Sequence, residues 1–324
     1  MGILNLGNNP CSLESKALID QEISYEIEMN DTPRVLSIQS HVVSGYVGNK
    51  SATLPLQLLG FDVDVINSVQ FSNHTGYKVT KGPILSDTDL DELIQGLAIN
   101  GLDTYSHLLT GYIGSPQVLN RIASLVSDLK SKNPHLIYVC DPVMGDNGKL
   151  YVRSELLPIY KELVTIADII TPNQFEVELL TDKKVSTIED AWDAIDILHQ
   201  RGCKTVVISS TEFGNDDYLV AMASSHADGH RRALTINIPK LPTSFTGTGD
   251  LFAALILAWM HKTNNLKSAL ENSINTLQAV LKKTWDYAKA VGDSRHNMEL
   301  KLVQSKNLIE NPQRVVFAVD VNKS

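Results

Sequence analysis

The sequence predicts an α/β fold in which a mostly parallel central sheet is covered by helices on both faces. Short apolar or β-branched segments alternate with longer amphipathic segments along most of the chain. Such alternation indicates parallel strands, because consecutive parallel strands must be joined by a crossover, usually a helix. With 324 residues, 43% of them hydrophobic and 20% charged, the chain can bury a sizeable core. We therefore expect a three-layer α/β/α sandwich.

The predicted strands are apolar or β-branched runs, and the predicted helices have apolar residues three to four positions apart. The strands are residues 34–40, 63–67, 107–110, 137–141, 169–171 and 205–209. The helices are residues 87–100, 116–132, 154–167 and 188–201, followed by a final pair at 250–261 and 266–291. Pro312 should end a last short helix. Residues 211–245 contain no motif that we can place.

Residues 1–32 mix acidic and polar side chains without a sustained apolar period. We expect a poorly ordered extension there and a single domain at residues 33–324. The longest strongly apolar run, residues 251–260, is about half of the roughly 20 residues that a membrane-spanning helix needs. The amino end also lacks a basic and then apolar signal pattern. We expect neither a membrane segment nor export.

The charge balance argues against a nucleic-acid partner. The chain has 28 Lys and Arg against 37 Asp and Glu, a net charge of −9, whereas neutralising phosphates requires clustered basic residues. Its three cysteines, Cys11, Cys140 and Cys203, are far apart and include no CxxC pair. Neither a disulfide framework nor a structural zinc site is indicated, and a reducing cytoplasm fits best.

The most informative motif is Thr246-Gly247-Thr248-Gly249-Asp250, which leads directly into an apolar helix. The backbone N–H groups of Gly247, Thr248 and Gly249 would point to one place at the positive end of a helix dipole, where a phosphate is stabilised. Asp250 would lie beside that place and could take the proton from a substrate hydroxyl. This arrangement predicts phosphorylation of an alcohol. The alternative is that Asp250 only caps its helix.

Two acidic residues flank an apolar turn at the carboxyl end of the predicted strand 137–141. Asp141 and Asp146 are the first and last residues of Asp-Pro-Val-Met-Gly-Asp. They could hold Mg²⁺ directly or through water, because that ion prefers one or two carboxylates together with phosphate oxygens. A loop with a capping Asp is the alternative.

Another polar pair follows the predicted strand 169–171. Asn173 and Glu176 are separated by one helical turn and so face the same way. Glu176 could join the metal ligands, and Asn173 could contact phosphate. A capping box, with Asn173 at the N-cap and Glu176 three residues later, explains the same residues equally well.

Three segments nearer the amino end combine flexible backbone, hydrogen-bond donors and flat aromatic rings. Ser40 ends the first predicted strand and is followed by a Gly-containing turn at residues 45–49. Phe71 precedes Ser-Asn-His-Thr-Gly-Tyr, and Tyr112 follows Thr-Gly. An aromatic surface beside hydroxyl and imidazole donors suits a planar, hydroxylated heteroaromatic ring. Alternatively, Phe71 and Tyr112 belong simply to the core.

Several common nucleotide and metal motifs are absent from the sequence. It contains no GxxxxGK[ST], no GxGxxG after a strand and no HExxH. The sequence therefore lacks the signatures of P-loop proteins, Rossmann dinucleotide-binding proteins and zinc hydrolases. Any ATP must be bound by a different structural motif.

Together these motifs resemble the pyridoxal kinase family of the ribokinase superfamily, in order and roughly in spacing, over residues 34–321. Gly-Thr-Gly-Asp marks the superfamily, whereas Asn-Ser-Val-Gln-Phe-Ser-Asn-His-Thr-Gly-Tyr at residues 67–77 is much more specific. The resemblance implies a ribokinase-like fold and transfer of the γ-phosphoryl group of ATP to the 5′-hydroxymethyl group of pyridoxal, pyridoxine or pyridoxamine. It also implies Mg²⁺ or another divalent ion, a monovalent cation such as K⁺, a cytoplasmic location and a homodimer.

The resemblance further implies roles for individual residues. Asp250 would be the catalytic base, and the amides of residues 247–249 would form the anion hole. The residues expected around the pyridine ring are Ser40, Val47, Val69, Phe71, Thr75, Tyr112 and Asp250. Those expected around ATP are Asp141, Asp146, Tyr151, Thr171, Asn173, Glu176, Ser209, Ser210, Thr246, Gly247 and Thr248, with Asp141, Asp146 and Glu176 as metal ligands. The segment between Asp146 and Tyr151 is shorter than the flap of some relatives.

Two other functions remain open. A kinase of the same type could act on another hydroxymethyl heterocycle, such as the thiamine-precursor pyrimidine, or on a sugar or nucleoside, and a substrate panel distinguishes these. A protein that binds B6 vitamers without turnover is the second alternative. Loss of Asp250 or of the flanking glycines would be its sign, and those residues are present.

Overall fold

The computed structural model describes residues 32–213, 217–226 and 229–322. The chain divides between Pro33 and Arg34 into two units, and every element named below belongs to the second, Arg34–Ser324. The predicted extension at residues 1–32 lies outside the described residues apart from Thr32. Its expected lack of order and the single domain at 33–324 therefore stay predictions.

Nine strands of the described chain form one sheet, in the order β11-β10-β9-β8-β7-β4-β3-β1-β2. Six of them run parallel: β1 (Arg34–Val42), β2 (Asp62–Phe71), β3 (His107–Thr110), β4 (Ile137–Cys140), β7 (Ile169–Ile170) and β8 (Thr205–Thr211). Three more pair antiparallel at one edge: β9 (Tyr218–Ser225), β10 (Arg232–Pro239) and β11 (Val319–Asp320). The mostly parallel sheet predicted from the sequence is confirmed.

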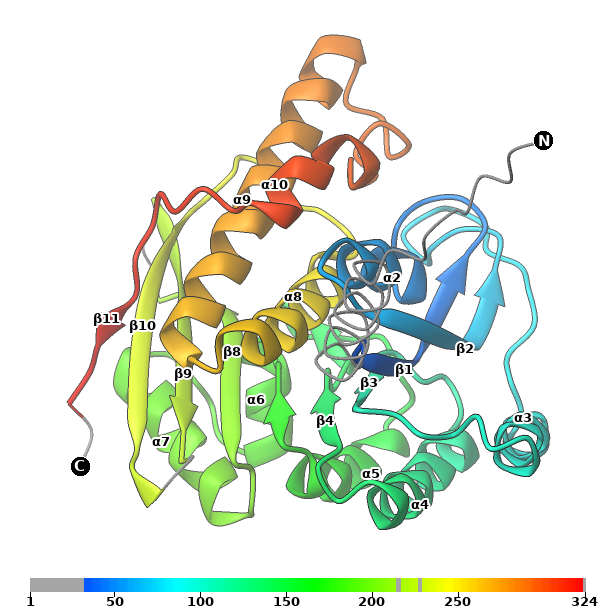
Figure 1. Ribbon diagram of the computed structural model, residues 1–324. Coiled ribbons are helices and arrows are strands. Elements are labelled where there is room, and N and C mark those ends of the chain that lie inside the picture. The colour runs from blue at the N-terminus through cyan, green and yellow to red at the C-terminus, as the bar shows by residue number, and fades with distance from the viewer. Residues whose placement is uncertain (1–31, 214–216, 227–228, 323–324) are drawn as a thin grey trace, which may run out of the picture. The chain divides into compact units, whose positions relative to one another are not determined.

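Helices cover both faces of this sheet (Figure 1). One face carries α3 (Asp87–Ile99), α4 (Pro116–Lys132), α5 (Leu156–Leu163), α6 (Gln174–Thr181) and α7 (Ile188–Gln200). The other carries α2 (Asn49–Leu58), α8 (Thr248–Thr263), α9 (Leu266–Val291) and α10 (Lys306–Glu310). Successive strand residues alternate between the two cores, so that Leu36 packs into the first and Val35 into the second. The predicted three layers are confirmed.

Most predicted elements differ from the observed ones only at their ends. The expected helix 154–167 is shorter, because α5 ends at Leu163 and a 3₁₀ turn, Val164–Ile166, follows. The helix preceding Pro312 ends at Glu310, as predicted. The sequence did not predict β9 and β10, which occupy much of the segment 211–245.

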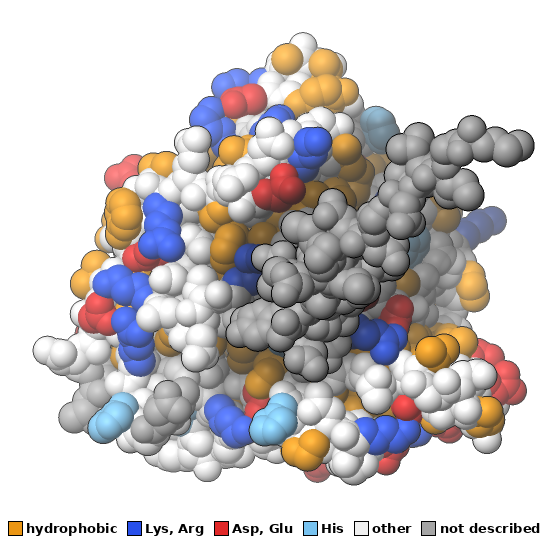
Figure 2. All heavy atoms as spheres, viewed as in Figure 1, with side chains coloured by type: hydrophobic (Ala, Val, Ile, Leu, Met, Phe, Trp, Pro, Cys, Tyr) orange, Lys and Arg blue, Asp and Glu red, His pale blue; other side chains and the backbone are white. Residues whose placement is uncertain are grey.

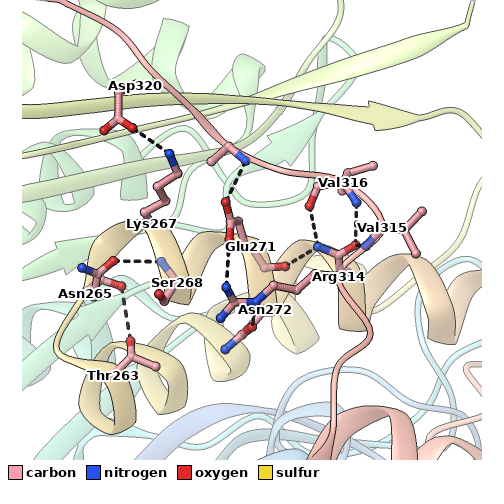
Figure 3. Close-up of polar contacts among 12 residues, drawn as sticks. Thr263, Asn265, Lys267, Ser268, Glu271, Asn272, Arg314, Val315, Val316 and Asp320 are labelled. Atoms are coloured by element: carbon pink, nitrogen blue, oxygen red, sulfur yellow. Dashed lines mark hydrogen bonds and ion pairs between the residues drawn. The ribbon is translucent and has the colours of Figure 1, made fainter.

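Buried polar side chains hold the C-terminal segment against α9 (Figure 3). Glu271 accepts a hydrogen bond from Arg314 Nη1 at 3.2 Å. Asn275 Oδ1 accepts from the N–H groups of Val315 and Val316 at 2.7 and 2.9 Å. These contacts lead the chain into β11, which pairs with β10 and completes that edge of the sheet.

The surface charges, the helices and the cysteines of the described chain can be compared with what the composition led us to expect. Figure 2 shows Lys and Arg interspersed with Asp and Glu over the face in view. Within the described part of the chain, no helix has both the length and the apolar character needed to cross a membrane. Cys140 and Cys203 are buried free thiols, and Cys11 lies outside the described residues.

Candidate active site

Several of the predicted ligand-binding residues lie along one edge of the sheet, because they follow the carboxyl ends of parallel strands. Ser40 is near the end of β1, Asp141 follows β4, and Thr171 follows β7. The Asp141 N–H donates to Thr110 O at 2.9 Å, and the Thr171 N–H donates to Cys140 O at 3.1 Å, so neighbouring strand ends stay aligned. Sheets of this kind bind ligands at this edge.

Gly247 is the N-cap of α8, so the amino end of this helix has no side-chain cap. Its φ is +81°, and a Cβ there would overlap the carbonyl oxygen of Tyr46, so a residue without a side chain is required. By contrast, α3, α4, α6, α7 and α9 each begin with a Ser, Thr or Asn side chain that accepts a hydrogen bond from the first turn. In α8 the N–H groups of Thr248 and Gly249 have no partner within the helix and can bind an anion.

Asp250 is the third residue of α8 and is half-buried beside those amides. Burial raises the pKa of Asp250, and hydrogen bonds from the Gly48 N–H and from its own N–H oppose that rise. A carboxylate with a raised pKa is a stronger proton acceptor than an ordinary aspartate. Asp250 is therefore both beside the anion-binding amides and suited to accept a proton.

Asp141 brings a second carboxyl group to the same helix end. It is 3% exposed, and its Oδ1 accepts a hydrogen bond from Thr171 Oγ1 at 3.1 Å. Its Oδ2 is buried with no hydrogen-bond partner among the described residues, and would lie 3.6 Å from a Cβ placed on Gly249. Burial, with the nearby charges of Glu176 and Asp250, holds the pKa of Asp141 well above its usual range. An acceptor left unpaired in such a place indicates a site for a cation or a proton.

Glu176 and Asn173 form the capping box that the sequence allowed. Asn173 Oδ1 accepts from the Glu176 N–H at 2.9 Å, and Glu176 Oε2 accepts from the Asn173 N–H at 2.8 Å. Glu176 Oε1 accepts from the Met144 N–H at 3.0 Å. Burial, opposed by these backbone hydrogen bonds, raises the pKa of Glu176 to about 8. Both oxygens of Glu176 thus already accept N–H groups.

The segment after Asp141 folds into a small hairpin of β5 (Gly145–Asp146) and β6 (Lys149–Leu150). Asn173 Nδ2 donates to Gly145 O at 2.8 Å, which ties the hairpin to the start of α6. The Asp146 carboxylate accepts from the N–H and the Nδ2 of Asn147, and burial raises its pKa. Tyr151, the residue after the hairpin, is 53% exposed.

The residues expected around a pyridine ring differ in burial. Ser40, Val47 and Val69 are buried, Phe71 and Tyr112 are half-buried, and Thr75 is exposed. Tyr112 also packs against the core beneath α3 to α7, so the core alternative is partly correct for it. Gly48 has φ +54°, and a Cβ there would overlap Ser40, which shows how closely the loop before α2 approaches the end of β1. Contact with a bound ring stays a prediction.

The remaining nucleotide candidates lie at the ends of β8 and α8. The register of β8 shifts between Ile208 and Thr211, where Ser209 and Ser210 lie, and such irregularities redirect side chains. The Ser209 N–H donates to Pro172 O at 3.0 Å. Thr246 is exposed just before α8. Their contact with a nucleotide also stays a prediction.

Two residues of this region have contacts that the sequence did not reveal. The N–H of Gly48, which the sequence placed only in a turn at residues 45–49, lowers the pKa of Asp250. Glu299, which is buried, accepts hydrogen bonds from Tyr77 and Tyr46, residues 222 and 253 positions away in the sequence. No local pattern distinguishes this one glutamate, so only the tertiary structure identifies it.

Two hollows of about 500 and 510 Å³ occur away from this edge of the sheet. One lies between α3 and α4 and the other beside α7, and neither is lined by a predicted site residue. The site is therefore defined by its chemical groups rather than by the hollows. Within the described ranges, no three His, Cys, Asp or Glu side chains cluster closely enough to hold a metal ion by themselves.

Comparisons with known proteins agree with the geometry. A family model described as phosphomethylpyrimidine kinase matches residues 95–295. The chain is 49% identical over 309 residues to pyridoxal kinase from Bos taurus, covering 90% of this chain and 99% of that protein. It is 50% identical to pyridoxal kinase from Arabidopsis thaliana, covering 88% and 93%. Pyridoxal kinase from Leishmania donovani, solved with ADP and pyridoxine, has a TM-score of 0.86 at 35% identity and covers 90% and 100%.

The α/β/α sandwich and the glycine-flanked aspartate at an uncapped helix start define a small-molecule kinase of the ribokinase-like class. Sequence identity of 40–50% to relatives of this kind over most of the chain assigns the protein to one family within this class. The chain belongs to the pyridoxal kinase family.

Proposed function

We propose that this protein transfers the γ-phosphoryl group of ATP to the 5′-hydroxymethyl group of pyridoxal, pyridoxine or pyridoxamine. The observation that carries the proposal is the uncapped amino end of α8, where Asp250 lies beside the amides of Thr248 and Gly249. The family membership supports the B6 vitamers as the alcohols.

In this reaction Asp250 accepts the proton of the 5′-hydroxyl group. The hydroxyl oxygen forms a bond to the γ-phosphorus, and the bond from that phosphorus to the bridging oxygen breaks, which releases ADP. The N–H groups at the start of α8 stabilise the negative charge on the migrating group. The Gly48 N–H lowers the pKa of Asp250 and so favours the charged carboxylate that accepts the proton.

The residues present fit a divalent cation such as Mg²⁺ bound together with ATP. Asp141 Oδ2 is a buried acceptor without a partner among the described residues, and Mg²⁺ needs only one or two carboxylates when phosphate supplies further oxygens. Asp141 would be the main protein contact, with Asp146 and Glu176 through water, since their oxygens already accept N–H groups. The ion would neutralise phosphate charge.

The other assignments extend the same proposal. Asn173, Thr171, Ser209, Ser210, Thr246 and Tyr151 would surround the nucleotide, and Ser40, Val47, Val69, Phe71, Thr75 and Tyr112 the vitamer. A monovalent cation, a homodimer and a cytoplasmic location stay predictions from the family resemblance.

The central test is Asp250→Asn. Loss of the base should lower kcat at least about 100-fold and leave ATP binding nearly unchanged. Asp89→Asn is the matched control. Asp89 occupies the corresponding third position of α3, where it completes a capping box and has no proposed role in the reaction. Near-normal turnover of Asp250→Asn would remove Asp250 from the role of base.

A substrate panel tests the acceptor. Coupled ADP release with the three vitamers, the hydroxymethyl pyrimidine, sugars and nucleosides should favour the vitamers. Preference for another alcohol by a factor of about 100, roughly 2.7 kcal/mol in transition-state binding, would overturn the B6 assignment.

A further inference from the structure

A buried carboxylate from the C-terminal part of the chain joins the two loops that carry predicted vitamer contacts. Glu299 lies in the segment after α9 and is 6% exposed. The first loop, residues 43–48, carries Val47, and the second, residues 72–80, carries Thr75. Neither the reaction described above nor the sequence motifs assign Glu299 a role.

Glu299 contacts both loops directly. Its Oε2 accepts the Tyr46 N–H of the first loop at 3.0 Å. Its Oε1 accepts the Tyr77 hydroxyl of the second loop at 2.9 Å and lies 3.2 Å from His74 Nε2. One carboxylate therefore fixes three groups, one before Val47 and two on either side of Thr75.

The orientation of His74 is also set within its loop. His74 Nδ1 accepts the Gly76 N–H at 3.1 Å, so the ring proton lies on Nε2 and points at Glu299. Burial alone would raise the pKa of Glu299, but hydrogen bonds from His74, Tyr46 and Tyr77 outweigh burial and hold it below its usual range. Glu299 is thus charged, and its hydrogen bonds are of the stronger, charge-assisted kind.

Gly45 is the feature that lets the carboxylate reach the first loop. Its φ is +100°, and a Cβ there would lie 2.5 Å from Glu299 Oε2. The next residue, Tyr46, donates its N–H to Glu299 while its carbonyl oxygen packs against Gly247 at the start of α8. Two residues further on, the Gly48 N–H is close enough to the Asp250 carboxyl group to lower its pKa. The first loop therefore contacts Glu299 at Tyr46 and approaches the start of α8, which carries Asp250.

We propose that Glu299 is a positioning residue that holds the loops 43–48 and 72–80 in the arrangement that binds the vitamer. The proposal rests on the proposed function for the identity of the substrate. In this role Glu299 acts through protein groups rather than by touching substrate or phosphate. Its effect passes through Tyr46 to Val47 and Gly48, and through His74 and Tyr77 to Thr75.

The test compares Glu299→Gln with Glu271→Gln. Both glutamates are nearly fully buried, and both accept a backbone N–H and a side-chain donor across a long sequence separation. Glu271, however, ties the C-terminal segment to α9 (Figure 3) and does not contact the two loops. Glu299→Gln should raise the KM for pyridoxal at least about 10-fold, the effect of weakening charge-assisted hydrogen bonds, with the KM for ATP changed less than about 2-fold. Glu271→Gln should change neither KM.

Tyr77→Phe gives a second, milder variant in case Glu299→Gln does not fold. It removes one donor to Glu299 without changing the ring and should raise the KM for pyridoxal about 3-fold or more. In the ligand-free protein both loop variants should be cleaved faster by trypsin at Lys78 and Lys81, which lie exposed in or next to the second loop. Glu271→Gln should be cleaved there at the wild-type rate.

Unchanged KM for pyridoxal in both loop variants would overturn the proposal, as would an equal rise in the KM values for pyridoxal and ATP. The proposed function fails separately, if the wild-type protein prefers another alcohol. In that case the same comparison is made with the KM for that alcohol.

Discussion

The carboxyl group of Asp141 should determine much of how the ligand-free enzyme responds to pH. Burial and the charges of Glu176 and Asp250 raise its pKa well above the value of about 3.9 in the unfolded chain. A raised acid pKa means that the folded state holds more protons, so the stabilisation is present at low pH and is lost as the pH rises through the folded pKa. Glu176, with a pKa of about 8, acts in the same direction.

We predict that the melting temperature of the protein without ATP or divalent ions falls between pH 6 and pH 9. Asp141→Asn should flatten this dependence and raise the melting temperature at pH 8.5 by about 2–4 °C, equivalent to about 1 kcal/mol. The same substitution should lower kcat at least about 10-fold, because stability and function compete at such a site. A wild-type slope in the variant would show that other groups dominate the titration.

At the level of single residues, local sequence was informative where chemistry depends on neighbours in the chain. Gly247 and Asp250 could be predicted together, because the N-cap of a helix and its third residue lie only three positions apart in the sequence. Glu299 could not, because its burial depends on Tyr46 and Tyr77, which are distant in sequence and approach it only in the folded protein.

At the level of elements, the start of α6 has two tasks. Asn173 caps the helix through its Oδ1 and holds the hairpin of β5 and β6 through its Nδ2. Thr187 caps α7 with the same capping-box geometry but has no contact with the hairpin. Comparing variants of the two caps therefore distinguishes an effect on helix stability from an effect on the function of the site.

We predict that Asn173→Ala and Thr187→Ala each lower the free energy of unfolding by about 1 kcal/mol, measured by urea denaturation. Only Asn173→Ala should raise the KM for ATP, by about 10-fold, because the hairpin loses its anchor and the nucleotide a polar contact. Equal KM values for the two variants would mean that Asn173 is a cap and nothing more.

The elements themselves could be predicted where the pattern is periodic. The helix 116–132 was predicted to the residue because its apolar positions recur every three to four residues. By contrast, β9 is buried on both faces over Val220–Ser225, so it lacks the alternation of a half-exposed strand. The bulge at Ser209 and Ser210 likewise arises from pairing with β9 and has no local signal.

At the level of the whole molecule, the alternation of strands and helices was enough to predict the layers and the parallel direction of most strands. It was not enough to predict the edge formed by β10 and β11. That edge depends on the C-terminal segment returning along α9, and the contacts that hold it are polar side chains spread over more than 40 positions of sequence. Such polar contacts leave no apolar periodicity in the sequence.

Asn275 makes three of the hydrogen bonds that hold this edge. It is 4% exposed, its Oδ1 accepts the N–H groups of Val315 and Val316, and its Nδ2 donates to Val316 O at 2.8 Å. Asn275→Ala would remove three hydrogen bonds to backbone groups that are only partly shielded from water, so we predict a loss of about 1–2 kcal/mol in the free energy of unfolding. Asn100→Ala, which removes an exposed amide bonded only within its own turn, should cost less than about 0.5 kcal/mol.

Release of the segment can be measured separately from global stability. Trypsin should cleave the Asn275→Ala variant after Arg314 under native conditions, whereas in the wild-type protein Asn275 holds Val315 and Val316, the residues directly after the cleavage point, and cleavage should be slow. If cleavage after Arg314 were equally slow in both proteins, Asn275 would not be what holds β11 against the sheet, and the ion pair of Lys267 with Asp320 would be the next contact to remove.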